Sequence, residues 1–336
     1  MSATRPRTTF GVCASSFPVS CGFARRDGQP ACAALLDAWG LIALAVEHGL
    51  TSVEMPLQGM LPDLSDRTLD RLRAALQEAG LALVVDSSVV AVERLGALLP
   101  LAARVGARVV RATLSTILEG ARAGLPGGWA AYLDELRRRI VALRPLLAAH
   151  GVVLALENHQ DAIADDLVAL CEAGDGWVGV TLDVANPLAV GEEPLQFART
   201  VGPWIRNVHL KDYQIYATMS GYRLVRCAIG QGVIPWAELL PLLAELAPGA
   251  FQQIELAALY ARHIRLLEDE WWHGYPPRDV RAVLPVLRLV ARYARPPQED
   301  WQTPWERGVP PEEVARYERD QFEASVRYLR AMSGEN

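Results

Sequence analysis

One unit recurs through the first 256 residues of the chain, and it constrains the fold more than any other feature. Each copy is a helical stretch, a glycine and a short apolar, β-branched run, as in His150-Gly151 followed by Val152–Glu157. A glycine just past a helix adopts the left-handed conformation that other residues reach only with strain. The repeat therefore predicts helices and strands in regular alternation.

The apolar runs predict eight strands: Thr9–Ala14, Thr51–Leu57, Leu81–Asp86, Ala107–Thr113, Val152–Glu157, Val178–Asp183, Ile205–Lys211 and Phe251–Leu256. The predicted helices are Ala31–Glu47, Asp66–Glu78, Ala91–Arg104, Gly128–Ala149, Ala162–Glu172, Glu193–Thr200, Trp236–Leu246 and Arg278–Tyr293. Such alternation pairs the strands in parallel through right-handed crossovers. Eight units predict an α/β protein of the (β/α)8 TIM-barrel type, with long loops at Asp212–Pro235 and Ala257–Pro277. An open doubly wound sheet is the main alternative, but no strand is followed by the G-x-G-x-x-G turn that would support it.

The C-terminal residues have a different composition. We expect the barrel to occupy residues 1–295 and an extension to occupy residues 296–336, because Pro296–Pro311 contains five prolines with Trp301 and Trp305. This pattern predicts an extended arm, and a helix then opens at Pro310-Pro311-Glu312-Glu313, where proline and acidic residues suit a first turn. We expect the helix to pack on the barrel or on a second subunit. The extension is thus the candidate surface for a homo-oligomer.

Charge and hydropathy exclude several classes of partner. The net charge of −6 argues against nucleic-acid binding, which normally requires a basic surface. No apolar run approaches the 18 residues that would suggest a membrane span. The five cysteines lack CxxC or CxxH spacing and are expected to be free thiols. These features favour a cytoplasmic protein that acts on a small molecule.

Four predicted strands each carry one metal-type ligand near the carboxyl end: Glu157, Asp183, His209 and Glu255. In a barrel, the carboxyl ends of the strands meet at one rim, where the βα loops build the active site. Three carboxylates crowded there would repel each other unless a cation lay between them. The donor set favours a divalent ion, Mn²⁺ or Mg²⁺, and also accommodates Co²⁺ or Zn²⁺.

The stretches E-N-H-Q-D, L-D-V-A-N, V-H-L-K-D, G-Q-G-V-I-P-W and Q-I-E-L resemble the xylose isomerase-like barrels, the sugar phosphate isomerase/epimerase superfamily. The resemblance covers roughly residues 8–295. It implies that Glu157, Asp183, His209 and Glu255 hold one divalent ion. It also implies that Glu157 and Glu255 move a proton on opposite sides of the substrate.

The resemblance implies two reaction types on a small keto-sugar or related polyol. In the first, an isomerase or epimerase passes a proton between Glu157 and Glu255 through an enediolate. In the second, a dehydratase (a lyase) eliminates water from a keto-cyclitol or keto-sugar such as inosose or dehydroshikimate. The sequence departs from the epimerase pattern at Asn186, where those enzymes have histidine. It departs again after His209, where their arginine is missing and Arg223 or Arg226 are the possible substitutes.

Several other residues are candidates for the site. Lys211 lies two residues after His209, so strand alternation points both side chains to the same side, and we predict a catalytic role. A charge partner for a nearby carboxylate is the alternative for Lys211. The candidates for substrate binding are His159, Asn186, Glu54, Arg111, Arg223 and Trp272. An ion pair inside the barrel explains Glu54 and Arg111 equally well, and a subunit interface explains Trp272.

Two further classes of function are weaker alternatives. A DNA-repair nuclease with this barrel would need a basic groove and more histidines than the six in this chain. A non-catalytic barrel used for binding would not need all four predicted ligands. The sequence therefore favours an enzyme that acts on a carbohydrate-like substrate.

Overall fold

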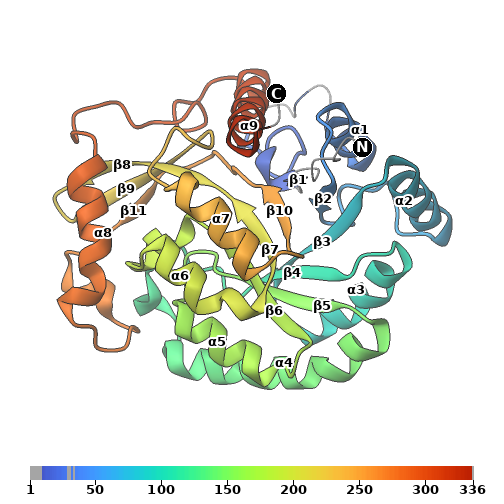
Figure 1. The fold of residues 1–336 in the computed structure, drawn as a ribbon, viewed down its shortest axis with the longest axis horizontal. Coiled ribbons are helices and arrows are strands. Elements are labelled where there is room, and N and C mark those ends of the chain that lie inside the picture. The colour runs from blue at the N-terminus through green and yellow to red at the C-terminus, as the bar shows by residue number, and fades with distance from the viewer. Residues whose placement is uncertain (1–9, 29–31, 33–34, 335–336) are drawn as a thin grey trace, which may run out of the picture.

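The computed structural model describes residues 10–28, 32 and 35–334, and its central feature is a closed barrel of eight parallel strands (Figure 1). The barrel strands are β1 (Phe10–Cys13), β2 (Ser52–Met55), β3 (Ala82–Val89), β4 (Val109–Thr113), β5 (Val153–Glu157), β6 (Val178–Asp183), β7 (Ile205–Leu210) and β10 (Phe251–Ile254). They follow the chain order around the barrel, and β10 closes it against β1. The predicted TIM barrel is confirmed.

The helices between the strands are α1 (Ala38–Glu47), α2 (Asp66–Ala79), α3 (Val92–Arg104), α4 (Trp129–His150), α5 (Ala164–Ala173), α6 (Pro194–Val201) and α7 (Trp236–Leu246). The predicted glycine stops are clear at α2 and α4, where Gly80 and Gly151 have φ of 66° and 63°. α1 begins at Ala38, later than predicted, because the Asp37 side chain accepts a hydrogen bond from the Gly40 N–H and caps the helix there. Residues 29–31, 33–34 and Thr9 lie outside the described part of the chain.

The two segments that were predicted as long loops contain strands, and that prediction was wrong. β8 (Asp212–Thr218) and β9 (Gly221–Cys227) form an antiparallel hairpin, and β11 (Arg262–Ile264) pairs with β9. We call this three-stranded unit the small sheet. A Cβ at Gly221 would lie 2.1 Å from the Ile264 carbonyl oxygen, so glycine permits the close approach of the two strands.

The first of the two C-terminal helices does not take the expected place of the eighth barrel helix. α8 (Val280–Tyr293) packs against β8 of the small sheet (Figure 1). α9 (Pro311–Ser333) packs on the barrel beside α1, where Arg319 forms an ion pair with Glu47 and the ring of Phe322 meets that of His48. Of the two placements predicted for the C-terminal helix, the structure shows the one on its own barrel.

The extension also holds two loops at the carboxyl ends of the barrel strands. The buried Glu318 carboxylate of α9 accepts hydrogen bonds from the Val19 and Ser20 N–H groups, at 2.8 and 3.0 Å. In the arm, Thr303 donates to the carbonyl of Leu259, which lies just beyond Glu255. Residues 296–333 thus help to fix the loops after β1 and β10.

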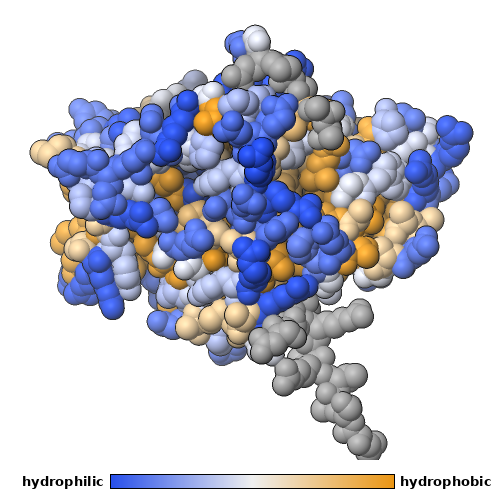
Figure 2. All heavy atoms as spheres, turned by 90° about the horizontal axis from the view of Figure 1, so that it is seen from above, coloured by the Kyte–Doolittle hydropathy of each residue, from blue (hydrophilic) through white to orange (hydrophobic). Residues whose placement is uncertain are grey.

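The remaining surface is mixed in character. On the face seen from above, hydrophilic residues cover most of the surface and hydrophobic residues form small groups between them (Figure 2). Within the described residues, no helix is both long enough and apolar enough to cross a membrane.

Candidate metal centre and its cavity

The strand register brings three of the four predicted metal ligands together. Asp183 on β6 lies opposite His209 on β7, and Glu157 ends the neighbouring strand β5. One donor atom from each of these residues lies within 4.8 Å of the other two, and all three side chains are buried. Neighbouring parallel strands end at the same level of a barrel, so this convergence follows from the position of each residue in its strand.

Glu54 on β2 fixes the orientation of the His209 ring. Its Oε1 lies 2.9 Å from His209 Nε2, and an ionised carboxylate can only accept, so Nε2 carries the proton. His209 Nδ1 then faces Glu157 Oε1 at 3.4 Å and makes no hydrogen bond. Metal-binding histidines commonly donate their other N–H to a carboxylate in this manner.

The crowding of charges around His209 shifts the pKa values of both partners. Burial alone would lower the pKa of His209, but the charges of Glu54 and Glu157 outweigh it and raise that pKa well above its usual value. Burial alone would raise the pKa of Glu157, but Arg111 and then His209 lower it well below its usual value. Without a further cation, the imidazole must itself serve as a positive partner for the carboxylates.

Lys211 lies between two of the predicted ligands, Asp183 and Glu255. Its Nζ lies 2.6 Å from Asp183 Oδ2 and also forms a close ion pair with Glu255. Burial would lower the pKa of Lys211, but Asp183 and Glu255 raise it, so the ammonium persists. Both expectations for Lys211 are thus compatible with its position, since it pairs with carboxylates and lines the cavity described below.

Arg111 on β4 is the second cation of the cluster, and it contacts three carboxylates. Its nitrogens lie 3.2 Å from Glu54 Oε1, 3.1 Å from Asp86 Oδ1 and 3.3 Å from Glu157 Oε2. Burial raises the pKa of Asp86 to about 7, even though Arg111 opposes the shift. Five carboxylates therefore face two permanent cations, and one divalent ion would offset much of the excess negative charge.

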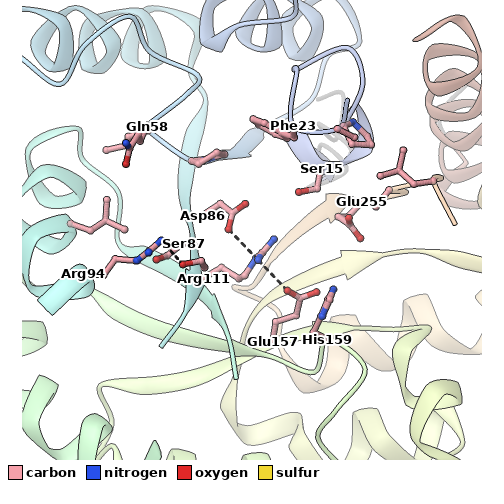
Figure 3. Close-up of a pocket in the computed structure, with 18 of the residues that line it drawn as sticks. Ser15, Phe23, Gln58, Asp86, Ser87, Arg94, Arg111, Glu157, His159 and Glu255 are labelled. Carbon is pink, nitrogen blue, oxygen red and sulfur yellow. Dashed lines mark hydrogen bonds and ion pairs between the residues drawn. The ribbon is translucent and has the colours of Figure 1, made fainter. Parts of the chain in front are cut away.

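The carboxyl ends of the strands border a cavity of about 880 Å³, which we call the mouth cavity (Figure 3). Its polar side includes Glu157, His159, Lys211 and Glu255, which lie toward the barrel strands β5, β7 and β10. The opposite side reaches Gln58 and Arg94 and includes apolar residues of α3. The residues that line it are Ser15, Pro18, Phe23, Ala24, Pro56, Leu57, Gln58, Leu64, Asp86, Ser87, Ser88, Arg94, Ala97, Leu98, Leu101, Arg111, Glu157, His159, Lys211, Arg226, Glu255, Ala257 and Leu259.

Two of the predicted substrate-binding residues line this cavity directly. They are His159 and Arg111, and burial lowers the pKa of His159 to about 4, so its ring is neutral at pH 7. Glu54 lies beneath them as the partner of His209. Asn186 is also one layer deeper, where its amide donates to Asp183 and its oxygen accepts from the Tyr213 hydroxyl.

The structure does not bring the other two candidates to the cavity. The guanidinium of Arg223 stacks over the ring of Trp301 in the arm, with 4.2 Å to the centroid. Trp272 packs against Trp271 and donates its indole N–H to the Leu266 carbonyl. The fold of the small sheet and of the loop before α8 decides both positions, and the sequence pattern did not reveal that fold.

Sequence reasoning missed one carboxylate and underrated one arginine. Asp86 lies near the carboxyl end of a predicted strand, the same signal that singled out Glu157 and Asp183, and it contacts Arg111. Arg226 was considered only as a substitute for a missing arginine, yet it lines the mouth cavity. Its position depends on the pairing of β9 with β8, which was read as a loop.

Comparison with known proteins agrees with this architecture. A family described as "Xylose isomerase-like TIM barrel" matches residues 42–268. The chain belongs to the xylose isomerase-like TIM barrel family. The resemblance inferred from the sequence motifs is therefore confirmed.

Individual relatives are more distant. YihM of Escherichia coli K12, an uncharacterised protein, is 26% identical over 175 residues, which are 50% of this chain and 54% of YihM. The chain thus spans about half the length of this curated relative. D-psicose 3-epimerase from Clostridium cellulolyticum H10, solved with D-tagatose, has 16% identity and a TM-score of 0.56, covering 96% of this chain and 99% of the epimerase. The IOLI protein with a bound zinc atom has 15% identity and a TM-score of 0.56, covering 85% and 99%.

Proposed function

We propose that this protein is a divalent-metal-dependent isomerase or epimerase that acts on a small keto-sugar or related polyol. The observation that carries the proposal is the convergence of Glu157, Asp183 and His209 on one point under the mouth cavity, with Glu255 also lining that cavity. The structural similarity to an epimerase that was solved with a ketose, at low identity, supports the fold on which the proposal is built.

The side chains fit a divalent ion. His209 Nδ1 is buried and makes no hydrogen bond among the described residues, and buried polar atoms normally have a partner. Glu157 Oε2 and Glu255 Oε2 are held only by the ion pairs with Arg111 and Lys211. Cys13, Glu54 and His209 form a second close group, but Glu54 is already engaged by Arg111 and Asn207, and burial raises the Cys13 thiol pKa. We therefore assign the ion to Glu157, Asp183, His209 and Glu255.

The oxygen-rich donor set favours Mn²⁺ or Mg²⁺, with Co²⁺ or Zn²⁺ as alternatives. The structural neighbour that contains a zinc atom supports the presence of an ion on this fold, without deciding its identity here. Bound in this site, the ion would supply Lewis-acid polarisation of the substrate carbonyl and its adjacent hydroxyl.

The residues of the chain would perform the proton transfer. Burial would raise the pKa of Glu255, but Lys211 lowers it, so Glu255 is ionised and able to act as a general base. Glu157 is ionised as well. It would take up a proton from solvent and deliver it to the opposite face of the enediolate, and Glu255 would release to solvent the proton that it removed. The Lys211 ammonium would donate a hydrogen bond to the oxygen on which negative charge develops.

Dehydration is the second candidate, and the position of Lys211 favours it. A protonated amine that lines the cavity beside Glu255 can give a proton to a hydroxyl that leaves from the carbon next to the enediolate. Asn186 adds to this alternative, because it is bound to Asp183 and Tyr213 where the epimerase pattern has a histidine. The product would then be a keto-cyclitol or keto-sugar that has lost water.

One experiment separates these possibilities. The purified protein and its Glu255→Gln variant are assayed for metal content and then incubated with keto-sugars and keto-cyclitols in deuterated water. We expect one divalent ion per chain, and deuterium incorporation or water loss that is absent in the variant. The mass of the product distinguishes an epimerase from a dehydratase. Failure to bind any metal after Mn²⁺ is supplied would contradict the proposal.

A further inference from the structure

Two neighbouring arginines of the small sheet, Arg226 and Arg262, form no ion pair within the described residues, and Arg226 lines the mouth cavity. In the antiparallel register, Arg226 on β9 lies opposite Tyr213 on β8, and Arg262 on β11 lies opposite Leu224 on β9. Residues directly opposite each other share a face of a sheet, and positions two apart in one strand also share it. Tyr213, Arg226 and Arg262 therefore lie on the same face.

That face is turned toward the metal centre. The Tyr213 hydroxyl donates to Asn186, which in turn donates to Asp183. Arg226 lines the mouth cavity together with Lys211 and His159. The small sheet thus presents Arg226 to the space in which the substrate would bind, and Arg262 lies next to it on the same face.

Arg226 is nearly enclosed and only partly satisfied. It is 4% exposed, and its Nη1 donates to the Tyr260 carbonyl at 3.0 Å. Its Nε is buried and makes no hydrogen bond among the described residues. The Tyr260 contact therefore leaves the guanidinium edge formed by Nε and Nη2, which is the edge that binds an oxyanion through two parallel hydrogen bonds.

Arg262 also has a guanidinium nitrogen without a hydrogen-bond partner. Its Nε is buried without a hydrogen bond, and burial together with the charge of Arg226 lowers the pKa of its guanidinium. The charges of Glu119 and Glu306 act on Arg262, but neither carboxylate forms an ion pair with it among the described residues, and both accept hydrogen bonds from backbone N–H groups. Within the part of the chain that the structure describes, neither Arg226 nor Arg262 forms an ion pair.

A buried cation without a partner, such as Arg226, is costly, and the half-buried Arg262 next to it adds repulsion. Evolution of a stable fold would favour a neutral residue there unless a ligand supplies the missing negative charge. Arg111, by comparison, is already surrounded by three carboxylates and offers nothing to an anion.

We propose that Arg226 and Arg262 form a subsite for an anionic group of the substrate, a carboxylate or another terminal oxyanion. This proposal rests on the proposed function for the rest of the substrate, since the carbonyl end would lie at the metal centre. The substrate class becomes an acidic keto-sugar or keto-acid polyol, in place of a neutral one. A carboxylate matches the planar guanidinium edge, and no glycine-rich phosphate loop occurs in the sequence.

The test compares matched ligands that differ only in their terminal group. Dissociation constants are measured by calorimetry for D-fructose, D-fructuronate and D-fructose 6-phosphate, because binding is detected whether or not turnover occurs. We expect at least one anion to bind about 10-fold more tightly than fructose, in line with a charge-assisted hydrogen-bond pair. A preference for fructuronate identifies a carboxylate site, and a preference for the 6-phosphate identifies a phosphate-type site.

Arg226→Met and Arg262→Met should each remove most of that preference while leaving the fructose affinity unchanged. Arg265→Met is the matched control, because Arg265 lies just past β11 but is paired with Glu119. The control should keep the full preference. Thermal unfolding of each variant establishes that it is folded, and Arg226→Lys provides a second variant that keeps the charge without the planar edge.

The results also separate this proposal from the proposed function. Equal binding of all three ligands, or equal weakening of all three by Arg226→Met, overturns the anion subsite, whatever the outcome of the turnover assay. Anion preference that depends on Arg226, in a protein that turns over no keto-sugar or keto-cyclitol, supports the subsite and counts against the proposed reaction.

Discussion

The two sides of the mouth cavity differ in whether their cations form ion pairs. On the barrel strands, every cation faces carboxylates: Arg111 contacts Glu54, Asp86 and Glu157, and Lys211 contacts Asp183 and Glu255. On the small sheet, Arg226 lines the same cavity and Arg262 lies on the same face of the sheet, and neither forms an ion pair among the described residues. One side carries an excess of negative charge and the other an excess of positive charge.

The ion-paired charges of the barrel side stabilise the fold, whereas we infer that the arginines of the small sheet bind a ligand. A buried charge is stable only when a partner compensates for its lost hydration. The barrel side has five carboxylates and two permanent cations, and on the small sheet neither Arg226 nor Arg262 forms an ion pair among the described residues. A divalent ion among the carboxylates and an anionic group of the substrate next to Arg226 would together balance these charges.

The largest expected effect concerns the barrel side. Glu255→Gln should lower kcat by about 10³-fold or more, because it removes a general base while keeping the shape of the side chain. The overall fold should persist, since Glu255 lies at the cavity and not in the apolar core. Activity of the variant near the wild-type level would remove Glu255 from the proton transfer.

Loss of Arg111 should produce the largest effect on stability. Arg111→Met would leave three carboxylates close together without their shared cation, at a cost of about 3–5 kcal/mol in the free energy of unfolding. Urea unfolding followed by circular dichroism measures the change. A loss below about 1 kcal/mol in the free energy of unfolding would mean that the crowded carboxylates take up protons or bind an ion when Arg111 is removed.

Removal of the proposed divalent ion tests the charge balance of the barrel side directly. Dialysis against a chelator should abolish activity and lower Tm, and added Mn²⁺ should restore both. An ion present at about 100 times its Kd contributes about 2.7 kcal/mol of stability. Asp183→Asn should abolish the Tm response to Mn²⁺, whereas a Tm response that survives in this variant would place the ion elsewhere.

The smallest effect is expected for the unpaired arginine. Arg226→Met should change the free energy of unfolding by no more than about 1 kcal/mol, because relief of an unpaired buried charge offsets the lost hydrogen bond to Tyr260. A loss of about 3 kcal/mol or more, as expected for a broken buried ion pair, would show that Arg226 has a structural role that the contacts do not reveal.

The barrel and the convergence of Glu157, Asp183 and His209 were predictable because both depend on local patterns. Each strand after the first is an apolar run that follows a helix and a glycine, and the carboxyl ends of parallel strands share one rim. It follows that Glu157, Asp183 and His209 could be expected to meet there. Asp86 carried the same signal and was overlooked.

The small sheet was not predictable in this way. The segments around Tyr213, Tyr222 and Arg262 were read as loops, since nothing local shows that a hairpin will be extended by a strand 35 residues further along the chain. For the same reason, Arg223 and Trp272 were expected at the cavity, although the folded chain directs them to Trp301 and Trp271.

The sequence by itself therefore determined the barrel, the end at which its site lies and the type of residues that could hold an ion. Only the tertiary structure decided how the charges are matched. Glu54 meets His209 across 155 positions of sequence, and Arg226 meets no carboxylate at all among the described residues. Pairing of charges depends on distances between side chains from different strands, and those distances exist only once the barrel and the small sheet have closed around the cavity.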